Sequence, residues 1–201
     1  MPQSSSGNSL GRLKVDTKSG SECFHSQGAD LDYTLLEFWR WNVSDLVSNT
    51  TRGVLAEFIV AKALGIETTV RDEWAAHDLT TADGVKIEVK SAAYVQIWAQ
   101  KRYSAIQFRT PKSRAWDPNT NVLDTESKRH ADVYVFALLA HKDKSTIDPL
   151  DLSQWQFYAV PTATLDARGQ GSISLSVLNS ICPPVDYQDL RQLVARTGKR
   201  L

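Results

Sequence analysis

The chain has little of what a disulfide-stabilised or zinc-stapled protein needs. Only two cysteines occur among its 201 residues, Cys23 and Cys182, and they lie far apart and outside any CxxC spacing. This argues against a disulfide framework or a zinc knuckle and favours a reducing environment. A chain of this length can bury a core without such staples. We therefore expect a single domain in a cytoplasmic protein.

Long apolar runs, histidine clusters and nucleotide-binding motifs are also missing. No stretch approaches the roughly 18 consecutive apolar residues of a membrane helix, so we expect a soluble protein with no membrane partner. The four histidines have no HxH or HxxxH spacing, which argues against a histidine metal centre. GxGxxG, GxxxxGK[ST] and GxSxG do not occur, so we expect neither a nucleotide cofactor nor serine-hydrolase chemistry.

The chain carries no net charge, because 23 Lys and Arg balance 23 Asp and Glu. Bulk electrostatics therefore do not indicate a nucleic-acid partner. The charges are unevenly placed, however, and one basic stretch without acidic residues contains Lys101, Arg102, Arg109 and Lys112. We expect these four side chains to contact nucleic acid. The alternative, an ordinary solvated surface, stays open for this stretch.

The spacing of apolar residues divides the chain into a tail and one domain. Residues 1–29 are rich in Ser and Gly without an apolar period, and they predict a flexible tail before a domain at 30–201. Residues 31–47 predict a helical lead-in. Further along we expect extended segments at 67–71, 77–81, 85–94 and 105–109, a polar loop at 112–129, a buried central strand at 132–140, a strand at 155–160 and a closing helix at 186–196.

The strongest helical pattern covers residues 49–64. We expect Asn49 as its N-cap, Gly65 in the left-handed position after its end, and a largely buried surface, because apolar residues occur nearly all round. One carboxylate, Glu57, lies within an apolar stripe of this helix, where an ionised group needs a partner. An ion pair of Glu57 with Arg52 or Lys62 is the simplest explanation, and a role in a functional site is the other.

Residues 85–90 alternate strictly between apolar and charged types. In a strand, this alternation places the apolar residues on a core face and Lys86, Glu88 and Lys90 on the opposite face. The preceding residues 82–84 suit a three-residue hairpin loop with Gly84 in the left-handed conformation.

That hairpin loop fixes which residues lie opposite one another. Counting outwards from it places Leu79 opposite Ile87 and Asp78 opposite Glu88, on the charged face. Opposed residues have Cβ atoms about 5 Å apart, so two like charges there are unfavourable without a cation. Carboxylate oxygens suit Mg²⁺ or Mn²⁺. Lys90, on the same face, can orient a water molecule and counter charge on a phosphate.

Two ordinary explanations compete with a metal site. Exposed strands often carry Glu and Lys as solubilising pairs, and a lone ExK triplet is weak evidence of catalysis. The carboxylates can also form a structural ion-pair network with Lys86 and Lys90. The order of the features favours catalysis: a helix with an acid, then an Asp, then a hairpin, then ExK on an alternating strand.

These residues resemble the PD-(D/E)XK nuclease superfamily, over about residues 49–140. The resemblance matches Asp78 to the motif Asp, Glu88 and Lys90 to the ExK, and Glu57 to the helical acid. It implies an α/β, restriction endonuclease-like fold with a mixed four- to five-stranded sheet flanked by helices. It also implies a Mg²⁺-dependent endonuclease that hydrolyses DNA phosphodiester bonds, with Mn²⁺ able to substitute and with Asp78, Glu88 and Glu57 as metal ligands.

The resemblance leaves several points open. Restriction, repair and resolvase enzymes share these residues. A catalytically inactive module that keeps the fold and binds nucleic acid or protein is the alternative function. Cleavage of both strands at a palindrome needs two active sites, so a homodimer is expected for that activity.

Overall fold

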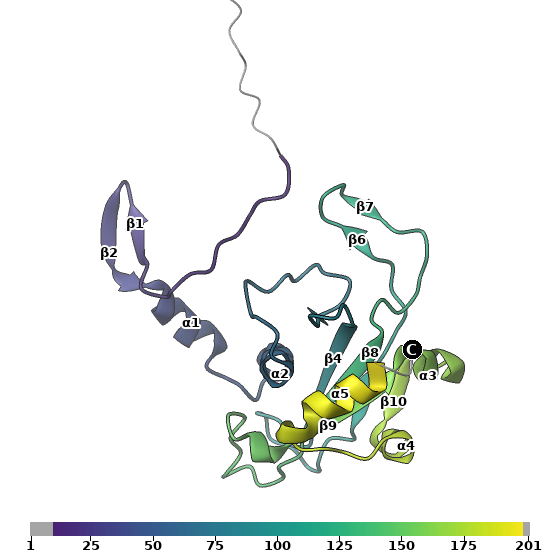
Figure 1. Ribbon diagram of the computed structural model, residues 1–201. Coiled ribbons are helices and arrows are strands. Elements are labelled where there is room, and N and C mark those ends of the chain that lie inside the picture. The colour runs from purple at the N-terminus through teal and green to yellow at the C-terminus, as the bar shows by residue number, and fades with distance from the viewer. Residues whose placement is uncertain (1–9, 199–201) are drawn as a thin grey trace, which may run out of the picture.

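A four-stranded mixed sheet in the order β3-β4-β8-β9 forms the centre of the fold (Figure 1). The computed structural model describes residues 10–198. In the sheet, β4 and β8 are parallel, whereas β3 and β9 are antiparallel to their neighbours. The strands are Leu79–Thr80 (β3), Lys86–Ala93 (β4), Val133–Leu139 (β8) and Trp155–Pro161 (β9). Helices pack against this sheet, so the predicted α/β class and mixed sheet are confirmed.

The sheet separates two apolar clusters. On one face, α2 (Asn49–Leu64) and α5 (Leu190–Gly198) cover the sheet. The other face is covered by a small sheet and two short helices: β5 (Gln107–Arg109), β10 (Ser172–Ser174), α3 (Thr162–Arg168) and α4 (Leu175–Ile181). All seven residues of β8 are buried, as predicted for a central strand with a continuous apolar run. No helix within residues 10–198 is long and apolar enough to cross a membrane.

The helix α2 forms where predicted, but its start and its burial differ from expectation. Ser48, not Asn49, is the N-cap, and its hydroxyl accepts the backbone N–H of Thr51. Gly65 ends the helix with a left-handed φ of 70°, as expected. The helix is not largely buried, since Val54 and Phe58 are 42% and 49% exposed. It packs on a single sheet, so only one of its apolar sides is covered.

The hairpin register is confirmed. Leu79 pairs with Ile87, Thr80 pairs with Lys86, and Gly84 has a φ of 87° in the connecting loop. The strand β3 is shorter than predicted, at two residues. Because β4 is eight residues long, most of its outer edge has no partner strand.

Several other elements depart from the predicted pattern. Residues 67–71 are irregular instead of extended as a strand. The polar loop contains a short hairpin of β6 (Trp116–Asp117) and β7 (Val122–Leu123). The helices α3 and α4 were not predicted. Two short 3₁₀ turns, η1 (Leu152–Gln154) and η2 (Tyr187–Asp189), precede β9 and α5.

Regular structure begins earlier than the predicted domain boundary at residue 30. The strands β1 (Cys23–Ser26) and β2 (Ala29–Thr34) form a hairpin inside and just beyond the predicted tail. Gln27 and Gly28 both have positive φ, as the two central residues of a type I′ turn require. The division into tail and domain at residue 30 stays a prediction. Residues 1–9 of that tail and 199–201 of that domain lie outside the described residues.

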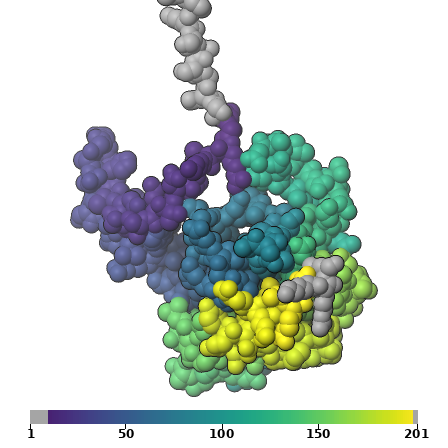
Figure 2. Space-filling model, viewed as in Figure 1, coloured from purple at the N-terminus to yellow at the C-terminus, as the bar shows by residue number. Residues whose placement is uncertain are grey.

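The β1–β2 hairpin leads directly into α1 (Leu35–Val43). The helical lead-in predicted for residues 31–47 is therefore confirmed only over α1, because residues 31–34 belong to β2 and residues 44–47 are not helical. Thr34 and Glu37 form a capping box at its start. No residue of α1 is buried, and Figure 1 shows the hairpin and α1 to one side of the central sheet. The preceding segment runs past the β6–β7 hairpin towards β1 (Figure 2), and Arg12 within it forms an ion pair with Asp72.

Candidate active site

The four residues predicted to form a site meet around the outer edge of the sheet. Asp78 directly precedes β3, and Glu88 and Lys90 lie on β4. Glu57 reaches the edge from α2. Asp78 is within electrostatic reach of the other three side chains. The structure therefore brings together residues that are up to 33 positions apart in the sequence, from position 57 to position 90.

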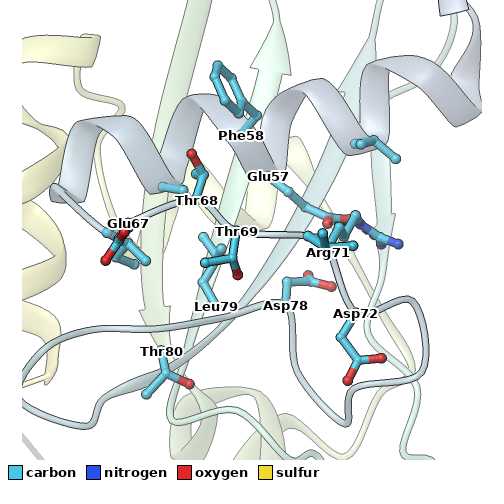
Figure 3. A pocket seen from close by; sticks show the side chains of 14 residues that line it. Glu57, Phe58, Glu67, Thr68, Thr69, Arg71, Asp72, Asp78, Leu79 and Thr80 are labelled. Atoms are coloured by element: carbon cyan, nitrogen blue, oxygen red, sulfur yellow. Dashed lines mark hydrogen bonds and ion pairs between the residues drawn. The ribbon is translucent and has the colours of Figure 1, made fainter. Parts of the chain in front are cut away.

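A cavity of about 300 Å³ opens at this edge, between α2 and the segment that leads to β3. Glu57, Arg71 and Asp78 line one end of it, and Figure 3 shows these three side chains grouped together. The rest of the lining mixes apolar side chains such as Phe58 and Leu79 with polar and acidic ones, among them Glu67, Asp72 and Thr80.

Asp78 is held by a backbone amide of β4. Its Oδ2 accepts the N–H of Val89 at 2.7 Å, while its own N–H donates to the carbonyl of Ile87 at 3.0 Å. The Asp78 carboxylate thus accepts the Val89 N–H in place of a backbone carbonyl of the neighbouring strand. Regular pairing of β3 with β4 begins one residue later, at Leu79. The ladder pairs stop at Leu79 and do not include the predicted pair of Asp78 and Glu88, although these two side chains interact electrostatically.

The environment of Asp78 disfavours its charge. Burial, followed by the nearby carboxylate of Glu88, raises the pKa of Asp78 to about 7. The hydrogen bond from Val89 and the charge of Lys90 act in the opposite direction and only partly offset this. A carboxyl group with its pKa near neutrality binds protons and cations in competition, and such groups cluster at functional sites.

Glu88 and Lys90 form an ion pair on the same face of β4. Lys90 Nζ lies 2.5 Å from Glu88 Oε1, and the side chains of Lys90 and Glu88 are 30% and 19% exposed, respectively. Glu88 also contributes, after burial, to raising the pKa of Tyr134 on the neighbouring strand to about 12. The ExK pair therefore faces partly buried surroundings instead of open solvent.

Glu57 is paired with Arg71, a residue that no motif in the sequence indicates. Arg71 Nε lies 2.5 Å from Glu57 Oε2, and Arg71 Nη2 lies 2.9 Å from Oε1. The hydrogen bond with Glu57 raises the pKa of Arg71. Neither of the two expected partners pairs with Glu57: Arg52 bonds to Ser91 and two groups near the start of α2, and Lys62 bonds to Thr68.

The donor set suits a hard divalent cation, but the donors are not gathered around one point. Among residues 10–198, no group of three or more His, Cys, Asp or Glu side chains is arranged to hold a metal ion. Two of the carboxylates are instead engaged in ion pairs, Glu57 with Arg71 and Glu88 with Lys90. Three carboxylates at one edge, one of them with a strongly disfavoured charge, are the oxygen donors that Mg²⁺ prefers.

The basic residues predicted to contact nucleic acid do not join this cluster. Lys101 and Arg102 are exposed in the loop after β4. Arg109 is exposed on β5, in the small sheet that covers the face opposite α2, and Lys112 is exposed just beyond it. None of the four forms an ion pair with a described residue, so all four cations face solvent, and their role stays a prediction.

Comparison with known proteins places the chain among nucleases. The match is to a family of endonucleases, and it spans residues 10–176, including Glu57, Asp78, Glu88 and Lys90. The family is described as Bacteriophage T4 endonuclease IV, and because the match covers most of the chain, the protein belongs to that family. No curated protein matches the chain.

Proposed function

We propose that this protein is a Mg²⁺-dependent endonuclease that hydrolyses DNA phosphodiester bonds, with a restriction endonuclease-like fold and a PD-(D/E)XK-type site. One observation carries the proposal: Glu57, Asp78, Glu88 and Lys90, ordered as helix, strand start and ExK strand, meet at one sheet edge. Membership of an endonuclease family supports the endonuclease activity from an independent direction.

Asp78 and Glu88 would hold the cation, and Glu57 would complete the set. Mg²⁺ bound there would draw electron density from the phosphodiester and ease deprotonation of water, and Mn²⁺ would serve the same purpose. The amide of Val89 fixes the Asp78 carboxylate in place, so its position does not depend on the cation. Glu88 is free to turn, since its described hydrogen bond is to the flexible side chain of Lys90.

Lys90 is the proposed positioning group for the attacking water. When Glu88 turns away, the Lys90 ammonium group loses its partner and keeps three donors for a water molecule or a phosphate oxygen. Its charge then opposes the negative charge that builds up on the phosphate during attack. Lys90 thus has two states, one paired with Glu88 and one directed at the substrate.

DNA cleavage with purified protein tests the proposal. The assay measures nicking and linearisation of a plasmid, and cutting of a single-stranded circle, in Mg²⁺, in Mn²⁺ and in EDTA. We expect cleavage with either cation, none in EDTA, and loss of activity in Glu88→Gln. Lys86→Met is the matched control, because Lys86 lies on the same strand and face but is not among the proposed active-site groups. Unchanged cleavage by the Glu88→Gln protein would refute the assignment of residues.

A second function, a non-cleaving module that binds nucleic acid or protein, is favoured by one observation. Arg71 and Lys90 already neutralise Glu57 and Glu88, as in a site that holds no metal. Calorimetry with Mn²⁺ separates the two functions. The nuclease predicts binding of at least one ion and weaker binding by Asp78→Ala, whereas the non-cleaving module predicts no binding by either protein.

The oligomeric state follows from the type of cleavage. Cutting both strands at a palindrome needs two active sites, and therefore a homodimer, whereas cutting one strand needs only a monomer. Sedimentation of the protein with and without DNA distinguishes the two.

A further inference from the structure

We infer that Arg71 is a phosphate-binding residue of the active site, held on Glu57 until a divalent cation and DNA release it. The inference rests on the proposed function, because it requires a cation and a phosphodiester at this edge. It assigns a role to a residue outside the four that the motif provides.

The guanidinium group of Arg71 occupies the carboxylate that a cation would need. Arg71 engages both carboxylate oxygens of Glu57, at 2.5 Å and 2.9 Å. Those are the oxygens that Glu57 would offer to a cation, so Arg71 and the cation compete for one carboxylate. A planar guanidinium group also binds phosphate in the same two-point geometry, so it can exchange a carboxylate for a phosphate without changing its own shape.

Arg71 is more exposed to solvent than its partner Glu57. The side chain of Glu57 is 15% exposed, whereas that of Arg71 is 43% exposed. Arg71 is therefore the more accessible member of the pair, and Figure 3 shows it beside Glu57 and Asp78 at the cavity. An incoming phosphate would meet Arg71 before it met Glu57.

Arg71 differs from the two arginines that are buried within residues 10–198. Arg52 is 3% exposed and donates to three different residues, and Arg129 is 8% exposed and also donates to three. Arginines that are buried and bonded to three different residues hold parts of the fold together. Within the described part of the chain, Arg71 donates only from Nε and one Nη2 hydrogen, both to Glu57. Three of its five donors therefore remain for a ligand.

The backbone around Arg71 permits the exchange. Arg71 belongs to the irregular stretch between α2 and β3 and precedes Asp78 by seven residues (78 − 71). No strand or helix fixes its backbone, so the side chain can move from Glu57 to a phosphate with a local adjustment. Binding of the cation to Glu57 would then favour binding of DNA by Arg71, and the reverse must hold by linkage.

Two binding measurements on Arg71→Gln test this exchange. The first is the dissociation constant for Mn²⁺ without DNA, by calorimetry. The second is the affinity for a labelled oligonucleotide in Mn²⁺, by fluorescence anisotropy, in a Lys90→Met background that prevents cleavage. Loss of the Arg71 charge should tighten Mn²⁺ binding, because Arg71 no longer competes for Glu57. It should also weaken DNA binding, because Arg71 no longer binds a phosphate, and each change should be about tenfold. Arg71→Lys should lie between the wild type and Arg71→Gln in DNA affinity.

Arg12→Gln is the matched control, because Arg12 anchors the same stretch through an ion pair with Asp72. It should leave both constants within about twofold of the wild type. If Arg71→Gln weakens Mn²⁺ and DNA binding together, or if Arg12→Gln has the same effects, Arg71 is only an anchor and the inference is overturned. A wild-type protein that binds no Mn²⁺ would overturn the proposed function first, and this inference with it.

Discussion

The strands β4 and β8 lie side by side, run parallel and pair along their length, yet they have opposite characters. Every residue of β8 is buried and apolar or aromatic. On β4 only alternate residues are fully buried along the first half, and Glu88 and Lys90 occupy the positions between. In register, Glu88 pairs with Tyr134 and Lys90 pairs with Phe136.

The difference arises from what lies on the outer side of each strand. β8 has a long partner on both sides, so nothing polar can reach water there. β4 has only the two-residue β3 on its outer side, and the carboxylate of Asp78 takes the next amide. A short edge strand therefore opens a polar site one strand away from a closed core. Substitutions at paired residues of β4 and β8 can therefore separate effects on function from effects on stability.

The largest expected effect is loss of cleavage in Lys90→Met. Removing a charged group that acts on the reacting phosphate or water should lower the turnover number by about 10²- to 10⁴-fold. The free energy of unfolding should change by less than about 1 kcal/mol, because the Glu88–Lys90 ion pair is partly exposed. Cleavage kinetics and urea unfolding measure the two quantities, and Lys86→Met should leave both near wild type.

The opposite result is expected one strand away, on the same rung. Phe136 is fully buried and contacts the ring of Phe108, with centroids 5.0 Å apart. Phe136→Ala should lower the free energy of unfolding by about 3–5 kcal/mol, measured by urea denaturation. Cleavage at low temperature, where the protein stays folded, should be retained. A Phe136→Ala protein with full stability would contradict the division between the two strands.

The third effect concerns pH. The pKa of Asp78 is raised from 3.8 to about 7, so the folded protein holds this proton more tightly than the unfolded chain. The associated stability is complete below pH 3.8 and is lost as the pH rises through about 7. Asp78→Asn should therefore stabilise the protein at pH 8, by on the order of 2–4 kcal/mol, with little effect near pH 4.

Thermal unfolding of the two proteins between pH 4 and pH 8 measures this difference. Asp30→Asn, at an exposed position on β2, is the control and should show no such trend. Equal melting temperatures of Asp78→Asn and wild type at pH 8 would show that the Asp78 charge is not disfavoured. The same proton should compete with a metal, so Mn²⁺ affinity should fall as the pH drops below about 7.

The smallest effect is expected far from the sheet edge. Lys101→Ala and Arg102→Ala should weaken DNA binding modestly and reduce its dependence on salt, by about one unit of slope for each phosphate that is no longer neutralised. Turnover at saturating DNA should not change, because neither residue lies at the site. Anisotropy titrations at several salt concentrations measure the slope. Lys128→Ala, at a lysine already paired with Glu126, is the control; an equal effect of this variant would indicate non-specific attraction only.

Local sequence signals predicted the parts of this structure that depend on local geometry. The register of β3 and β4 followed from a three-residue loop with Gly84, because loop length alone fixes which residues oppose. The central strand β8 followed from an uninterrupted apolar run. The end of α2 followed from Gly65, which alone suits the left-handed conformation at that point.

The parts that depend on tertiary contacts were not predicted. Arg71 lies in a stretch without any period, so nothing local indicated that its side chain reaches Glu57. The bond from Val89 to Asp78 replaces a regular ladder contact, which alternation cannot reveal. β5 pairs with β10, about 65 residues later, and such long-range pairing leaves no trace in either segment. The exposed side of α2 was missed because apolar periodicity does not say how many faces will be covered.

The hydrogen bond between Val89 and Asp78 gives the site a built-in spectroscopic reporter. An amide that donates to a carboxylate feels directly whether that carboxylate is protonated, ionised or bound to a metal. In a nitrogen-15 NMR spectrum, the Val89 signal should move with pH through the neutral range and move again when Mg²⁺, a diamagnetic ion, is added. The amide of Val135, its partner on β8, should stay still. One backbone resonance can therefore follow the occupancy of the site without any substitution in the protein.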